Sequence, residues 1–140
     1  MPIKILTNTW LREVDEVFRH LNLNPRHKNV GDCAVRAISL LMDEPWDKIY
    51  TDLSVLGFEM KDLLDSNAVW GQYLNRNGYR RHIIPDTCPD CFTIKDFCRD
   101  NPEGKFLLAT GTHVVTVIDG DYYDTWDSGD KIPIYFWKKK

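Results

Sequence analysis

The hydrophobic pattern of this 140-residue chain changes once, near Gly78. Before that glycine, apolar residues recur at intervals of three and four, which predicts amphipathic helices. After it, short apolar and β-branched runs are separated by Pro, Gly and Asp, which predicts strands. Helices followed by strands predict an α+β fold in which N-terminal helices pack on a C-terminal antiparallel β-sheet. The length and the apolar content predict one domain with its own core.

The pattern predicts four helices in the first half of the chain. They begin near Leu11, Asp32, Pro45 and Ser66. The first ends at about Leu21, before Pro25, and the second has Asp32 as its N-cap residue and Cys33 in its first turn. Strands are predicted at 79–84, 106–110, 113–118, 122–126 and 132–137, with a short helix at 93–98. We therefore expect a helical segment at 1–25, a helical half at 29–78 and a sheet half at 79–137.

The dipeptide Asp119-Gly120 allows a prediction of strand register. Between two β runs it favours a two-residue type I′ turn, which places Ile118 opposite Asp121. Counting back from the turn places Val115 opposite Asp124 and His113 opposite Trp126, all on one face of the hairpin. His113 and Asp124 are then diagonal neighbours that an imidazole and a carboxylate can bridge. Asp127 falls on the other face, so we expect Asp124 to orient His113.

Composition argues against several classes of function. Eighteen basic and 21 acidic residues give a net charge of −3, so no broad electropositive field invites nucleic acid or anionic lipid. The chain has no apolar run of membrane-spanning length and no signal-peptide pattern, and its Cys spacing does not resemble a secreted disulfide framework. We expect a cytoplasmic protein that binds neither membranes nor nucleic acid and needs no cofactor. The oligomeric state is left open.

Cys33 and His113 are the candidate catalytic pair. A thiol in the first turn of a helix lies near the positive end of the helix dipole, which favours the nucleophilic thiolate. A His on a neighbouring strand would complete the activation, and Asp124 would fix its tautomer. Each residue also has a structural explanation, since a helix-start Cys is commonly a small core residue and a strand His can be an ordinary interior side chain. Their order and predicted proximity favour catalysis.

These residues resemble the papain-like cysteine peptidase superfamily, in particular its compact bacterial and phage members, the staphopain-like and bacteriocin-leader peptidases. The resemblance rests on a Cys that opens a helix, a distant His on a strand, and Asp124-Thr-Trp126 after it. It covers roughly residues 29–130 in topology and implies a papain-like fold with a Cys-His-Asp triad. It also implies peptidase or acyl-transfer activity on a peptide or protein substrate. Hydrolysis and acyl transfer fit these residues equally well.

The chain departs from the family at the oxyanion position. Papain-like enzymes place a Gln about six residues before the nucleophile, and here that residue is His27, with Asn29 four residues before Cys33. We expect the Cys33 backbone N–H to stabilise the oxyanion, with Asn29 as the first side-chain candidate and His27 as the second. The Gly-Ser-Cys-Trp signature of papain is absent as well. Four residues are expected to line the substrate cleft: Gly31, Asp32, Thr112 and Trp126.

Cys88-Pro-Asp-Cys91 supports a rival hypothesis. Two Cys separated by two residues can form half of a tetrahedral zinc site, which Cys98 and His82 would complete. A second Cys-x-x-Cys or a close His pair is missing, so we expect no metal site here. Two alternatives to the enzyme therefore stay open: a catalytically silent papain-like binding module and a small zinc-binding interaction domain. The first 25 residues could form an integral helix or a removable segment, and we favour the integral helix.

Overall fold

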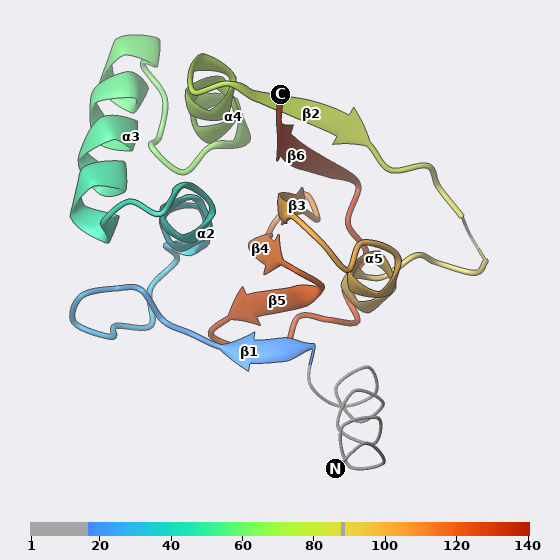
Figure 1. Ribbon diagram of the computed structural model, residues 1–140. Coiled ribbons are helices and arrows are strands. Elements are labelled where there is room, and N and C mark those ends of the chain that lie inside the picture. Colours follow the sequence, from blue (N-terminus) through green and yellow to red (C-terminus); the bar gives the residue numbers. More distant parts are fainter. Residues whose placement is uncertain (1–16, 88) are drawn as a thin grey trace.

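A computed structural model describes residues 17–87 and 89–140 and has an α+β architecture (Figure 1). Its four helices are α2 (Cys33–Met42), α3 (Trp46–Met60), α4 (Asn67–Arg76) and α5 (Ile94–Asp100). Its six strands are β1 (Phe18–His20), β2 (Tyr79–Ile83), β3 (Lys105–Ala109), β4 (Val114–Ile118), β5 (Asp121–Asp124) and β6 (Tyr135–Lys139). Helices α2 to α4 fall in the expected helical half, and α5 and five strands fall in the expected sheet half.

The strands form one sheet in the order β1-β5-β4-β3-β6-β2. The sheet is mixed, because β1 runs parallel to β5 while every other pair is antiparallel. The expected purely antiparallel sheet is therefore wrong at this edge. The expected first helix is also wrong over Phe18–His20, which pair with Tyr122–Asp124 as a strand. Its part before residue 17 lies outside the described residues.

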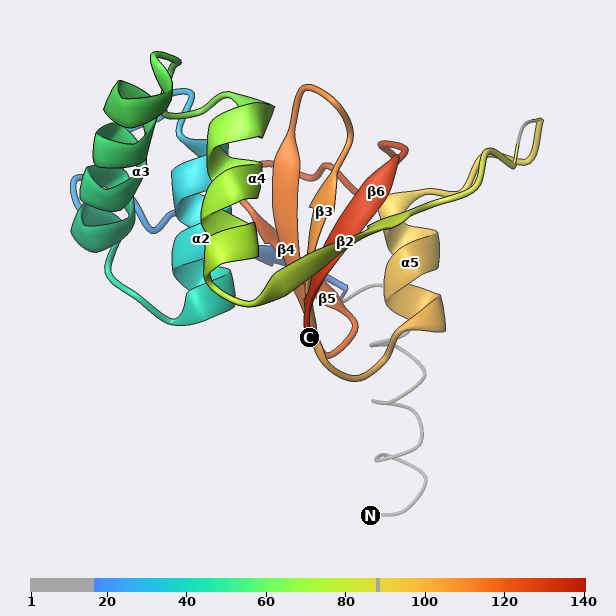
Figure 2. The ribbon, with the colours of Figure 1, turned by 90° about the horizontal axis from the view of Figure 1, so that it is seen from above.

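Helices cover both faces of the sheet. Figure 2 shows α2, α3 and α4 on one side and α5 on the other, with α3 outermost. The alternation along β3 explains the two layers: Leu107 and Ala109 pack toward α2 to α4, while Phe106 and Leu108 pack toward α5. Fully buried aliphatic side chains such as Ile38 contribute roughly 1.5–3 kcal/mol each to this core.

Local capping follows the sequence closely at two helices. The Ser66 hydroxyl accepts a hydrogen bond from the Val69 N–H and caps α4, as predicted. Thr93 and Asp96 form a reciprocal capping box at the start of α5. Asp32 lies at the N-cap position of α2, but its carboxylate does not cap the helix. It is engaged by other side chains at the candidate site.

The turn between β4 and β5 has the predicted form. Asp119 and Gly120 have φ angles of 49° and 81°, and Ile118 pairs with Asp121 as expected. This turn fixes which side chains of the hairpin face α2.

Among the described residues, no helix has the length and apolar character needed to cross a membrane.

Candidate functional site

Cys33 and His113 come together where the first turn of α2 meets the start of β4. Cys33 is the first residue of α2, and His113 lies one residue before β4. The thiol is half-buried, and hydrogen-bonding interactions with the His113 ring and the Val114 backbone N–H lower its pKa. The α2 helix is held against β4 here by the Thr116 hydroxyl, which donates to the Ala37 carbonyl at 2.6 Å. The structure thus brings the sequence-predicted pair to one place, where each residue shifts the pKa of the other.

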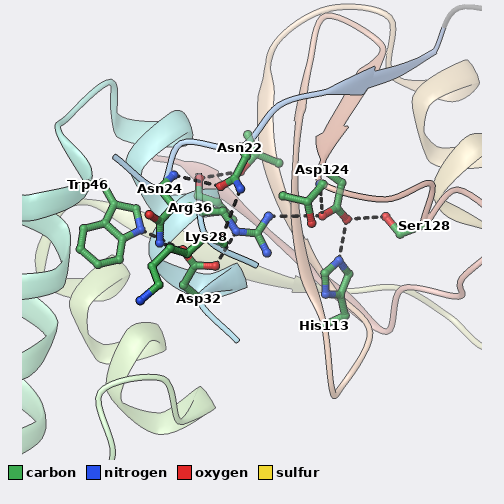
Figure 3. Close-up of polar contacts among 12 residues, drawn as sticks. Asn22, Asn24, Lys28, Asp32, Arg36, Trp46, His113, Asp124 and Ser128 are labelled. Carbon is green, nitrogen blue, oxygen red and sulfur yellow. Dashed lines mark hydrogen bonds and ion pairs between the residues drawn. The ribbon is translucent and has the colours of Figure 1, made fainter. Parts of the chain in front are cut away.

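Asp124 meets His113 as the hairpin register predicts. The imidazole Nε2 lies 2.6 Å from Asp124 Oδ2, and the carboxylate is 1% exposed (Figure 3). Because Nε2 is engaged by Asp124, Nδ1 is the ring nitrogen left to face Cys33. The Ser128 hydroxyl also donates to Oδ2, at 2.7 Å, and the Thr125 N–H donates to Oδ1 at 2.8 Å. Asp124 is therefore held on both oxygens.

Trp126 lies against the imidazole, as expected from its place opposite His113. The two ring centroids are 4.8 Å apart at a tilt of 42°. The indole remains 43% exposed, so it covers the His113 ring on one side while facing solvent on the other. Asp127 instead accepts a hydrogen bond from the Tyr122 hydroxyl, away from His113. The prediction that Asp124 contacts His113 in preference to Asp127 is confirmed.

The pKa directions of the three residues are mutually consistent. Burial raises the pKa of the Cys33 thiol. The hydrogen bond with His113 and the charge of His113 lower it by more than that, so the net pKa is below the ordinary thiol value. Burial lowers the pKa of His113, but the hydrogen bonds with Asp124 and Cys33 raise it to about 9. Burial raises the pKa of Asp124, yet the bonds from His113 and Ser128 hold it below its usual range. The arrangement favours a thiolate facing an imidazolium.

Arg36 joins this group, although no sequence motif pointed to it. Its Nε donates to Asp32 Oδ1 at 2.7 Å, and its Nη1 lies 3.4 Å from Asp124 Oδ1 (Figure 3). The remaining oxygen of Asp32 accepts from the Trp46 indole at 3.0 Å and from the Asn24 amide at 3.2 Å. Only the (i, i+4) pairing of Asp32 with Arg36 could have been found from spacing.

A cleft of about 520 Å³ opens above the thiol and the imidazole. All four residues expected to line the cleft do so, and Asn29 lines it as well. They are joined there by Lys28, Val30, Arg36 and Thr125. His27, by contrast, is an exposed residue with a φ of 54° and does not line the cleft. The structure therefore brings Asn29, and not His27, to the mouth of the site.

The loop that carries Asn29 is tied by its own polar side chains. The Asn22 amide donates to the Lys28 carbonyl at 3.3 Å, and its carbonyl oxygen accepts from the Asn24 N–H at 3.0 Å. The Asn24 side chain then accepts from the Arg26 N–H at 2.9 Å and donates to Asp32. These hydrogen bonds connect the loop to Asp32 at the start of α2. Asn29 therefore lies in a segment whose backbone is held by side-chain hydrogen bonds.

Cys91, Cys98 and His82 are not among the residues that line this cleft. Cys98 is 2% exposed within the α5 layer of the core, where burial raises the pKa of its thiol to about 12. The His82 ring stacks on Phe136 at 4.9 Å. Within 17–87 and 89–140, no three His, Cys, Asp or Glu side chains gather closely enough to hold a metal ion. Cys88 lies outside the described residues, and Cys91 is half-buried.

Comparison with known proteins gives no match to a family model, a curated protein or a solved structure.

Proposed function

We propose that this protein is a cysteine-dependent hydrolase or acyltransferase acting on peptide, isopeptide or other amide bonds, with Cys33, His113 and Asp124 as its triad. The observation that carries the proposal is the continuous chain of contacts from the Cys33 thiol through His113 to the buried Asp124 carboxylate, with the thiol and the imidazole lining an open cleft. A buried carboxylate behind a His that contacts a thiol is the arrangement that activates a sulfur nucleophile.

The proposed reaction has two stages. The Cys33 thiolate attacks the carbonyl carbon of the substrate, and His113 passes its proton to the leaving amine as the C–N bond breaks, which leaves a thioester on Cys33. Water or a second amine then attacks the thioester carbon and His113 accepts its proton, and the C–S bond breaks so that Cys33 leaves as a thiolate. With water the outcome is hydrolysis, and with an amine it is acyl transfer. Asp124 keeps the imidazole in one orientation throughout.

The oxyanion of the tetrahedral intermediate needs hydrogen-bond donors beside Cys33. The first N–H groups of a helix have no intrahelical acceptor, and the Cys33 N–H opens α2. Asn29 lines the same cleft and directly follows Lys28, whose carbonyl accepts a hydrogen bond from Asn22. We assign these two donors to the oxyanion. His27 is dropped from this role because it lies outside the cleft lining.

We further propose that the fold is papain-like. The support is the order Cys33, His113, Asp124 along the chain and their placement: Cys33 begins helix α2, His113 directly precedes strand β4, and Asp124 ends strand β5. The expected substrate is a peptide or protein that enters between the two sides.

An acyl probe tests the proposed chemistry without knowledge of the substrate. Incubation with p-nitrophenyl acetate should release a burst of p-nitrophenolate and leave an acetyl group on Cys33, located by peptide mass spectrometry. Cys33→Ala and His113→Ala variants should lose the burst, while a Cys91→Ala variant should retain it. Equal slow release by the parent and the Cys33→Ala variant would overturn the proposal.

A catalytically silent binding module of the same fold is the second candidate. It is favoured by the position of His27, which replaces the family's Gln and lies away from the cleft. Under that hypothesis the cleft would bind a peptide without forming an acyl intermediate, and the acetyl probe would give no burst.

A further inference from the structure

A guanidinium is buried between the element that carries the nucleophile and the element that carries the acid. Arg36 lies one turn after Cys33 on α2, and Asp124 ends β5, 88 residues further along the chain. The Arg36 side chain is 11% exposed, and its partners Asp32 and Asp124 are 6% and 1% exposed. Burying charged groups is costly unless each is paired, so such a cluster needs a reason.

Helix stability alone does not account for the contact with Asp124. An Asp–Arg pair at (i, i+4) stabilises a helix only slightly, and Asp32 with Arg36 already forms that pair. The other contact of the guanidinium, from Nη1, is with Asp124 at the end of strand β5. Lys, with one ammonium, has no comparable fork for two carboxylates at once.

The other contacts of Asp124 indicate the role of the contact with Arg36 Nη1. Its Oδ1 is held by Arg36 and by the Thr125 N–H, while Oδ2 faces His113 and Ser128. A carboxylate held at Oδ1 cannot rotate without breaking these bonds. We propose that Arg36 is a positioning residue of the candidate site, one that bridges α2 to β5 and fixes the carboxylate oxygen that Asp124 presents to His113. This inference rests on the proposed function.

The surroundings of Arg36 identify the other groups that can influence it. At the start of α2 these are Asp32 and Cys33, and on the preceding loop Lys28, which lines the same cleft. On the sheet they are His113, Asp124 and Tyr123, the last of which lines a small cavity of about 10 Å³ with Arg36. Arg36 is a cation that also favours the Cys33 thiolate. Removing it should therefore disfavour the thiolate and move its formation to higher pH.

Rates of Cys33 alkylation by iodoacetamide across pH test the inference. The alkylation rate of the parent increases with pH as the thiolate forms, and in Arg36→Met this increase should occur at higher pH. Within the pH range of the increase, the rate of Arg36→Met should be about 3- to 10-fold below that of the parent. Arg36→Lys keeps the positive charge but cannot bridge two carboxylates. Its alkylation rate should lie between those of the parent and Arg36→Met. Arg76→Met is the matched control, because Arg76 is an exposed residue of α4 paired with Glu59 at 3.8 Å, and its profile should match the parent's.

The outcomes separate the two claims. An Arg36→Met profile that superimposes on the parent's, even with a lower Tm, would overturn the positioning role and leave the proposed function standing. If Arg36→Met does not fold, an Arg36→Lys profile identical to the parent's would overturn it equally. A parent protein with no low-pH alkylation of Cys33 would overturn the proposed function, and this inference with it.

Discussion

His113 Nε2 and Asp124 Oδ2 lie 2.6 Å apart on the same face of the β4–β5 hairpin. The two-residue turn at Asp119-Gly120 sets this relationship, since a one-residue change in the turn would send the two side chains to opposite faces. The hairpin is thus the structural element that makes an acid–imidazole pair, and α2 brings the thiol to it.

Asp124→Asn should lower the pKa of His113 from its value of about 9, because the imidazolium loses a charged hydrogen-bond partner. The measurement is an NMR titration of the His113 ring nitrogens. Asp127→Asn is the matched control, because Asp127 bonds to Tyr122 and should leave the His113 titration unchanged. Equal effects of the two substitutions would contradict the assignment of Asp124.

The stability of the fold should depend on pH through His113. Because its pKa of about 9 lies above the ordinary 6.5, its charged form stabilises the fold fully below pH 6.5, and this contribution is lost as pH rises toward 9. The lowered pKa of Cys33 acts in the opposite sense, so the measurement uses a Cys33→Ser background. The Tm of Cys33→Ser should fall as pH rises above 6.5, and the fall should end below pH 9 because Cys33 no longer helps to raise the pKa of His113, whereas Cys33→Ser/His113→Gln should lack that fall. A fall of the same size in both proteins would refute the linkage.

Asn29→Ala should separate acylation from alkylation. Acylation by p-nitrophenyl acetate develops an oxyanion and should slow by roughly 100- to 1,000-fold, since one donor is removed. Alkylation by iodoacetamide develops no oxyanion and should keep its rate. His27→Ala should change neither rate, because His27 lies away from the cleft. Parallel losses in both reactions of Asn29→Ala would mean that Asn29 shapes the thiol environment instead.

Gly129→Ala should destabilise the fold by roughly 1–3 kcal/mol in a urea-unfolding experiment, because the added methyl group would collide with the Tyr122 hydroxyl and with Lys95 Cε. The segment concerned also carries Ser128, a partner of Asp124. Gly31→Ala is the control for stability, since a Cβ there meets nothing within 4 Å and should cost under about 0.5 kcal/mol. Unchanged stability of Gly129→Ala would show that this turn shifts freely.

The parts of the site that follow from local rules were predictable from sequence. A turn residue pair and the period of two along a strand were enough to place Asp124 beside His113. Arg36 was not predictable as a partner of Asp124, because nothing in local spacing connects residues 88 apart. Asp32 has the residue type of an N-cap, but buried donors from Arg36 and Trp46 compete for its carboxylate.

The strand β1 shows the other limit of sequence reasoning. Val14, Val17, Phe18 and Leu21 recur at helical spacing, yet Phe18–His20 form a strand. The residues gain backbone pairing with Tyr122–Asp124 at the edge of the sheet, and tertiary pairing of this kind overrides local periodicity. The same pairing makes the sheet mixed, which the pattern of strands alone did not indicate.

We propose that Cys33 is a thiolate activated by His113. Iodoacetamide labelling across pH, with the modified Cys mapped by mass spectrometry, tests it in the parent and in His113→Ala. We predict selective labelling of Cys33 well below the ordinary thiol pKa of about 8.5, lost in the variant, with Cys91 as the internal reference. Slow, uniform labelling of the Cys residues in both proteins would contradict the account.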